Sequence, residues 1–246
     1  MRAWWLLAVV ACGSGDDDKG DEVPSADTGA QATTAPTTSL PTDSDLPTTD
    51  TVVLTRPGGG CVLLSGGQDR IRATDAVVPT GGDPRTLQVW VRTTSRSDQV
   101  ALSQGLAAPE LAVYLGTSGG HAMVTNGGLP HVDTDLFVAD GEWHHLLVTM
   151  EEQTATLWLD GHQGQTFDIV TTTSDGEVVG GGTPTGDLIP WQGWLDDAKI
   201  FRRVRLPAEI EADLDGDDTA LALWWDFELT GAGAGLTVPD VSGQGG

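Results

Sequence analysis

Two tryptophans carry the strongest sign of a ligand site in this 246-residue sequence. In the segment 86–92, three apolar residues alternate with polar ones, so a strand would turn Trp90 away from its apolar face. In the segment 155–160, the same alternation turns Trp158 away from the apolar face of its strand. An outward indole flanked by polar groups can stack on a sugar while its neighbours bind hydroxyl groups. The alternative is a tryptophan covered by a loop or a second layer. The predicted ligand-binding residues are Trp90, Trp158, Gln88, Arg92 and Asp160.

Catalytic chemistry has little support in the residue pattern. Glycoside hydrolysis needs two carboxylates that face one another. The alternate acids Glu209, Glu211 and Asp213 fall on a predicted helix, where residues two apart point away from each other. His144 and His145 are neighbours on a predicted strand and so face opposite sides. We therefore predict that the protein is not an enzyme, although the sequence alone leaves a Ser-His-Asp triad open.

The elements that must position these side chains are mostly strands. Short segments with two-residue periodicity alternate with glycine-rich turns, which predicts an all-β, two-sheet antiparallel jelly-roll sandwich. One helix is expected near the C-terminus, over 206–214, because Pro207 opens it and Leu206, Ile210 and Leu214 share one face. The predicted strands are 61–64, 70–72, 86–93, 99–103, 111–115, 144–150, 155–159 and 194–201.

The first twelve residues place one arginine before eight apolar residues and end in Ala11 and Cys12. This order resembles the signal of a bacterial lipoprotein, in which the cysteine is lipidated and becomes the mature N-terminus. The resemblance implies lipidation of Cys12, export, and anchoring to the cell membrane or outer membrane, facing the periplasm or the cell surface. The alternatives are a cytoplasmic protein with a hydrophobic start and a wrongly assigned start codon.

The segment 13–50 is acidic, rich in Thr, Pro and Ser, and poor in apolar bulk. It cannot bury enough surface to offset chain entropy, so we expect a disordered N-terminal tether before one folded domain at 51–246. Across the whole chain, 36 acidic and 12 basic residues give a net charge of −24. That charge argues against nucleic-acid binding. Cys61 is expected to be an unreactive, buried strand cysteine.

Four motifs follow one another along the chain: Asp140–Thr149 (DGEWHHLLVT), Ala155–Gly161 (ATLWLDG), Gln192–Phe201 (QGWLDDAKIF) and Leu206–Ile210 (LPAEI). In order and spacing they resemble the bacterial laminin-G-like jelly roll of the concanavalin A-like superfamily. Upstream, Leu64–Ile71 and Thr86–Val91 resemble that family's first turn and next strand. The resemblance covers about residues 60–228 and implies the same sandwich that the periodicity predicts.

Metal binding is open, because extracellular modules commonly bind Ca²⁺ through clustered carboxylate and carbonyl oxygens. The acid-rich turn 213–218 does not fit an EF-hand, since its sixth position is Asp218 instead of glycine. The family resemblance points to Asp69, Asp196 and Asp240 as a possible Ca²⁺ site.

The C-terminal segment resembles the opening strand and turn of such modules, and no counterpart opens the domain at residue 51. We expect 221–227 to close this domain as a strand, because an unpaired hydrophobic strand favours aggregation. The alternative is that 221–246 is the remnant of a second module.

These observations predict an envelope-anchored adhesion module that binds a glycan or an extracellular protein, has no catalytic activity, and meets the membrane only through its lipid. A glycoside hydrolase or lyase on the same fold, and a purely structural envelope protein, are the alternatives, because fold does not determine function.

Overall fold

The computed structural model describes Arg56 and the ranges 59–73, 76–106, 111–173, 177–184, 189–211, 218–228 and 238–243. The predicted signal with Cys12 and the predicted linker lie outside these residues. No helix in the described ranges is long and apolar enough to cross a membrane.

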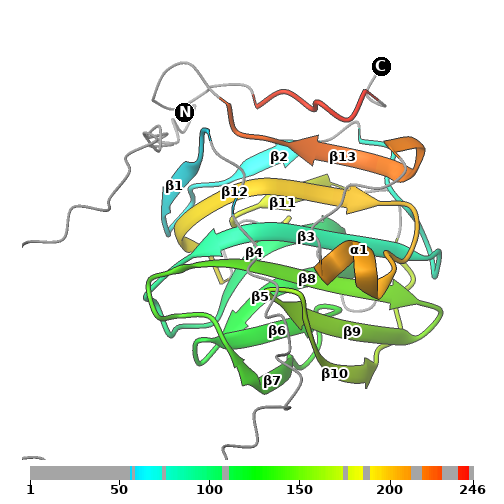
Figure 1. The fold of residues 1–246 in the computed structure, drawn as a ribbon, viewed down its shortest axis with the longest axis horizontal. Helices are drawn as coiled ribbons and strands as arrows, with labels where there is room; N and C mark the ends of the chain where they lie inside the picture. Colours follow the sequence, from blue (N-terminus) through cyan, green and yellow to red (C-terminus); the bar gives the residue numbers. More distant parts are fainter. Residues whose placement is uncertain are drawn as a thin grey trace, which may run out of the picture. The chain divides into compact units, whose positions relative to one another are not determined.

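The described chain forms two antiparallel sheets that pack face to face (Figure 1). One sheet has the strand order β1-β12-β3-β8-β9-β10, with β13 also paired to β12, and the other has the order β2-β11-β4-β5-β6-β7. The strands of the seven-stranded sheet are β1 (Val62–Ser65), β3 (Arg85–Arg92), β8 (Trp143–Glu151), β9 (Thr154–Leu159), β10 (His162–Asp168), β12 (Gln192–Phe201) and β13 (Leu221–Trp225). The strands of the six-stranded sheet are β2 (Ile71–Ala73), β4 (Gln99–Gly105), β5 (Ala112–Ser118), β6 (His121–Thr125), β7 (His131–Phe137) and β11 (Glu177–Gly180).

The main core lies between the two sheets and follows strand alternation. Leu87, Val89 and Val91 of β3 belong to it, and so do Val113 and Leu115 of β5. All five side chains are fully buried. The all-β, two-sheet antiparallel prediction is therefore confirmed.

Helix α1 (Pro207–Glu211) lies on the outer face of the seven-stranded sheet (Figure 1). The only other helical element in the described chain is the short 3₁₀ turn η1 (Asp218–Ala220). Figure 1 shows α1 lying across β3 and β8. Ile210 of α1 packs against Leu147 and Trp158, which point away from the main core. The predicted helix therefore begins where expected, and it is described as far as Glu211.

The ten-residue strand β12 joins the two ends of the domain. Its first half pairs with β1, and its second half pairs with β13 on the same side. The prediction that 221–227 supplies a closing strand is confirmed by this pairing.

The sequence pattern does not predict β6, β7, β10 and β11. Strands β7 and β10 are the outer strands of their sheets and have polar sequences. An edge strand buries little side-chain surface, so the alternation that identifies inner strands is weak there.

Candidate functional site

The predicted aromatic residues lie on the outer face of the seven-stranded sheet, but they are not exposed. Trp90 and Trp158 are absent from the main core cluster, as their strand parity requires. Their exposed fractions are nevertheless 2% and 5%, and Gln88 is fully buried. The prediction that these three side chains present a surface to a ligand is therefore wrong.

The outer face is buried because chain segments from other parts of the sequence lie over it. Arg205, just before α1, is buried and donates to Oε1 of Gln88. Arg56 contacts both Asp196 of β12 and Trp143 of β8, the strands that flank β3. Strand parity determines which face a side chain takes, but it does not reveal what covers that face.

Asp160 pairs with a histidine instead of standing free beside Trp158. Its Oδ2 lies 2.7 Å from Nδ1 of His144, and its Oδ1 accepts from the backbone N–H of His145 at 2.8 Å. Nε2 of His144 lies 3.0 Å from Oδ1 of Asp140. Burial alone would lower the pKa of His144, but hydrogen bonds and charges from Asp160 and Asp140 outweigh it and raise the pKa.

Each of the three predicted calcium ligands already has a hydrogen-bond or ion-pair partner within the protein. Oδ2 of Asp69 accepts from the backbone N–H of Ser65 at 3.0 Å, and Oδ1 of Asp240 accepts from that of Trp224 at 3.0 Å. Asp196 is paired with Arg56. Burial raises the pKa of Asp196 to about 7, although the Arg56 guanidinium lowers it.

The structure does not bring these three carboxylates together. Across the described ranges, no three His, Cys, Asp or Glu side chains are grouped so that they could hold a metal ion. The expectation that Asp69, Asp196 and Asp240 form one metal site is therefore wrong within the described ranges, where each of them has a separate partner. Calcium binding itself stays a prediction.

Cys61 is fully buried and disulfide-bonded. The expectation of a free, buried thiol is therefore wrong. Cys12 is the only other cysteine of the sequence and lies outside the described residues.

A cleft of about 950 Å³ opens at one end of the sandwich. There β1 and β3 end, β12 begins, and the loop before β8 passes by. We call it the rim cleft. The described residues that line it are Leu63, Leu64, Ser65, Arg92, Thr93, Thr94, Ser95, Asp140, Gly141, Glu142, Gln192, Gly193 and Trp194.

The loop 140–142 is fixed in place at this cleft. Nε of Arg92 donates to the carbonyl of Gly141 at 2.5 Å, and Oδ1 of Asp140 accepts from the backbone N–H of Glu142 at 2.9 Å. Burial alone would raise the pKa of Asp140, but hydrogen bonds from Glu142 and His144 lower it. The cleft thus combines a guanidinium, carboxylates, hydroxyl groups and the half-buried indole of Trp194.

Arg92 is the predicted ligand-binding residue that lines the rim cleft. Gln192 and Trp194 were not predicted as site residues, because the motif that contains them indicates only a strand. A further motif in the sequence, Gly116–Gly120, fits Gly-x-Ser-x-Gly. This segment joins β5 directly to β6, so it lacks the strand-to-helix turn that exposes a nucleophilic serine.

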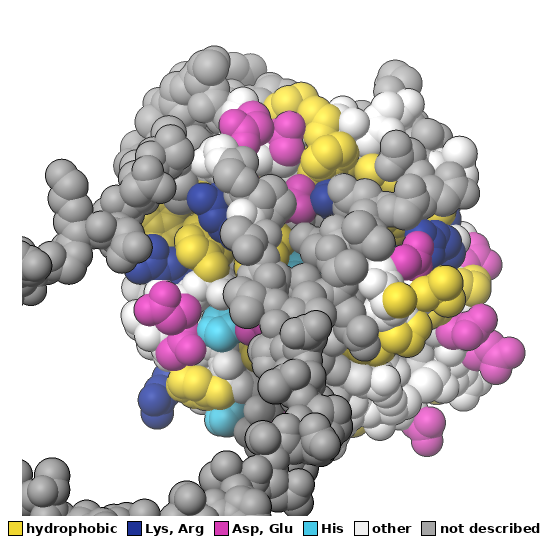
Figure 2. Space-filling view, viewed as in Figure 1, with side chains coloured by type: hydrophobic (Ala, Val, Ile, Leu, Met, Phe, Trp, Pro, Cys, Tyr) yellow, Lys and Arg dark blue, Asp and Glu magenta, His cyan; other side chains and the backbone are white. Residues whose placement is uncertain are grey.

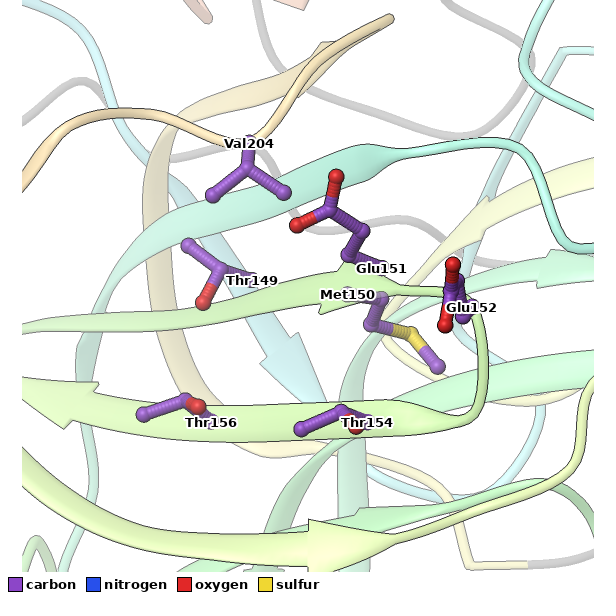
Figure 3. Close-up of a pocket in the computed structure, with 7 residues that line it drawn as sticks. All are labelled: Thr149, Met150, Glu151, Glu152, Thr154, Thr156 and Val204. Carbon is purple, nitrogen blue, oxygen red and sulfur yellow. The ribbon is translucent and has the colours of Figure 1, made fainter.

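A smaller pocket of about 480 Å³ lies on the outer face at the β8–β9 hairpin. Figure 3 shows threonines of β8 and β9 along its floor, Glu151 and Glu152 near the hairpin, and Val204 opposite. Thr149 and Thr156 are cross-strand partners. No aromatic ring is among the described lining residues, so the pocket is less suited to a sugar than the rim cleft.

The comparisons with known proteins agree on the fold. The sequence profile of the family described as "Concanavalin A-like lectin/glucanases superfamily" matches residues 65–211. No curated protein sequence gave a significant match.

Two solved structures with sugars are similar in fold. The CBM40 module of a Ruminococcus gnavus sialidase, bound to α2,3-sialyllactose, has a TM-score of 0.50 and 16% identity, covering 66% of this chain and 98% of that one. Domain 4 of an extracellular arabinanase from Geobacillus stearothermophilus, in complex with arabinotriose, has a TM-score of 0.50 and 18% identity, covering 62% and 75%. A heptameric pentraxin from Limulus polyphemus has a TM-score of 0.50 and 14% identity, covering 63% and 82%.

Proposed function

Because the chain belongs to the concanavalin A-like lectin/glucanases superfamily, we propose that it is a carbohydrate-binding module whose saccharide occupies the rim cleft. The family match confirms the resemblance stated from the sequence motifs. The observation that carries the proposal is the lining of the cleft, where polar side chains surround one indole. Saccharide sites combine these two chemistries. Both similar modules hold a saccharide, and the arabinotriose bound to one of them is uncharged.

The charge of the protein favours a neutral saccharide. Asp140 and Glu142 contribute carboxylates to the cleft, and the chain carries a net charge of −24. Figure 2 shows acidic and basic side chains interspersed on one face, without a continuous basic stripe among the described residues. An anionic sugar would be repelled by this field, which falls off with salt.

The test is a glycan array with the full chain, followed by affinity measurements on two cleft variants. Gln192 is suited to substitution, because its backbone carbonyl and N–H are held by Thr93 and Gln99 while its side chain is exposed. We expect Gln192→Ala and Arg92→Ala to weaken binding by about 1 to 3 kcal/mol, as for lost polar contacts. Arg72→Ala is the matched control, since Arg72 pairs with Glu177 on the other sheet.

Retained affinity in both cleft variants, or an equal loss in Arg72→Ala, would contradict the placement of the site. Binding to no glycan would contradict the proposed function.

Binding without catalysis is part of the proposal. The cleft acid Asp140 already accepts from Glu142 and contacts His144, so it is engaged in holding the loop. We expect no release of reducing ends or unsaturated products when the bound glycan is incubated with the protein. Turnover that disappears in Asp140→Asn or Glu142→Gln would support the hydrolase or lyase alternative.

The second part of the proposal is envelope anchoring through Cys12. We expect Cys12→Ala to move the protein from the membrane fraction to the soluble fraction, and the intact mass of the wild type to include a lipid. A lipidated Cys12 has no thiol left, so in such a chain it cannot be the partner of the disulfide-bonded Cys61. Wild-type protein wholly in the soluble fraction would exclude the anchor.

A further inference from the structure

Arg56 is held by three different parts of the domain. Its guanidinium pairs with Oδ2 of Asp196 on β12. It donates to the carbonyl of Gly60 at 3.5 Å, and its Cζ lies 4.8 Å from the ring centroid of Trp143 on β8. A carboxylate, an aromatic face and a carbonyl are the groups that recognise a guanidinium.

These three groups together form a site for a guanidinium. The side chain of Asp196 is 3% exposed, whereas that of Arg56 is 18% exposed. A buried carboxylate is costly unless a cation compensates it. The carboxylate therefore belongs to the packed sheet, whereas the guanidinium comes from a residue outside the strands.

A second observation at the same place points to an incoming chain. Trp90 is the cross-strand neighbour of Asp196. Its indole Nε1–H is buried and has no hydrogen-bond partner among the described residues. Such a donor could satisfy a backbone carbonyl of a bound peptide.

We propose that Asp196, the indole of Trp143 and the carbonyl of Gly60 form a guanidinium-binding site, which Arg56 occupies in cis and which an arginine side chain of a partner protein can take. Arginine fits better than lysine, because its planar fork pairs with carboxylates and stacks on indoles. The acidic net charge of the chain also attracts a basic partner. This proposal does not depend on the proposed saccharide function, although Trp143 is the cross-strand partner of the cleft residue Arg92.

Because Arg56 of the same chain occupies the site, an arginine from another molecule must compete with it. Arg56 competes as a tethered ligand with a high effective concentration. Removing it should therefore expose the site to free ligand.

The experiment uses N-acetyl-L-argininamide as the probe, titrated by NMR or calorimetry into the full chain. We expect Arg56→Ala to bind it about a hundredfold more tightly than the wild type, the lower end of the range of about 10² to 10⁴ that tethering provides. The uncharged near-isostere N-acetyl-L-citrullinamide should not bind. The double variant Arg56→Ala, Asp196→Asn should lose the interaction, whereas Arg56→Ala, Asp226→Asn keeps it as the matched control.

Equal affinity of wild type and Arg56→Ala, or equal binding of the citrulline probe, would overturn the proposal. If Arg56→Ala does not fold by itself, its refolding yield with each probe gives the same comparison. Recovery with the arginine probe alone supports the site, and recovery with neither or with both contradicts it. A failed glycan array would leave these results unaffected.

Discussion

His144 lies between Asp140 and Asp160, so the protonation of one ring is linked to the loop that lines the rim cleft. The protonated ring can donate to both carboxylates, whereas the neutral ring can donate to only one. Its raised pKa means that the folded state holds the proton more tightly than the unfolded chain does. This contribution to stability is fully present below the ordinary histidine pKa and is lost as the pH rises through the higher folded value.

We expect the free energy of unfolding of the wild type to fall over that pH window, and His144→Gln to lack this part of the dependence. Urea denaturation at several pH values, starting below the ordinary histidine pKa and rising through the higher folded value, measures it. His162→Gln is the control, because the His162 side chain is exposed. Its ring Nδ1 lies within hydrogen-bond distance of the backbone carbonyl of Asp160, a group that does not titrate. Identical slopes for wild type and His144→Gln would refute the link.

Helix α1 is an element that tertiary contacts hold in place. It has five residues, far fewer than an isolated helix needs. Oε2 of Glu209 accepts from the backbone N–H of Leu206 at 2.6 Å, which caps the first turn. Arg203 pairs with the same carboxylate, and its hydrogen bond lowers the pKa of Glu209 to about 2. The helix then seats Ile210 on the outer face.

We expect Ile210→Ala to destabilise the domain by about 2 to 5 kcal/mol, because the side chain is fully buried against Leu147 and Trp158. Denaturation followed by tryptophan fluorescence measures the change. Leu206→Ala should have little effect, because Leu206 is 62% exposed. Similar losses in both variants would show that the helix does not cover the sheet through Ile210.

At the scale of the whole molecule, the two ends of the domain meet. The backbone N–H of Gly60 donates to Oε1 of Glu228 at 2.8 Å. A Cβ at position 60 would lie 2.0 Å from the carbonyl oxygen of Phe227. Together with the pairing of β1 and β13 to one strand, this close approach makes the C-terminal segment part of the same sandwich.

We expect Gly60→Ala to lower the melting temperature through an overpacking cost of about 1 to 3 kcal/mol, because backbone atoms must shift. Gly82→Ala is the control, since its nearest neighbour would be 3.7 Å away. A melting curve for Gly60→Ala that matches the control would mean that the two ends are not closely packed in solution.

The fold class, the inner strands β3, β4, β5, β8, β9 and β12, and the face on which their residues lie could be predicted from the sequence alone, whereas the inner strands β6 and β11 could not. These features depend on local periodicity, which β3 and β8 display because one side of each strand is buried in the main core. The hydrophobic residues of 221–227 favoured a closing strand over the remnant of a second module, because such a strand needs a partner, and the pairing of β13 with β12 shows which alternative holds.

Which surfaces are open depends on the packing of distant segments. Trp90 and Trp158 have the parity of surface residues, yet Arg56 and the α1 region, distant in sequence, lie over their face. The rim cleft likewise joins residues from β1, β3, β12 and the loop before β8. Exposure and convergence depend on contacts between distant segments, which the alternation of neighbouring residues does not encode.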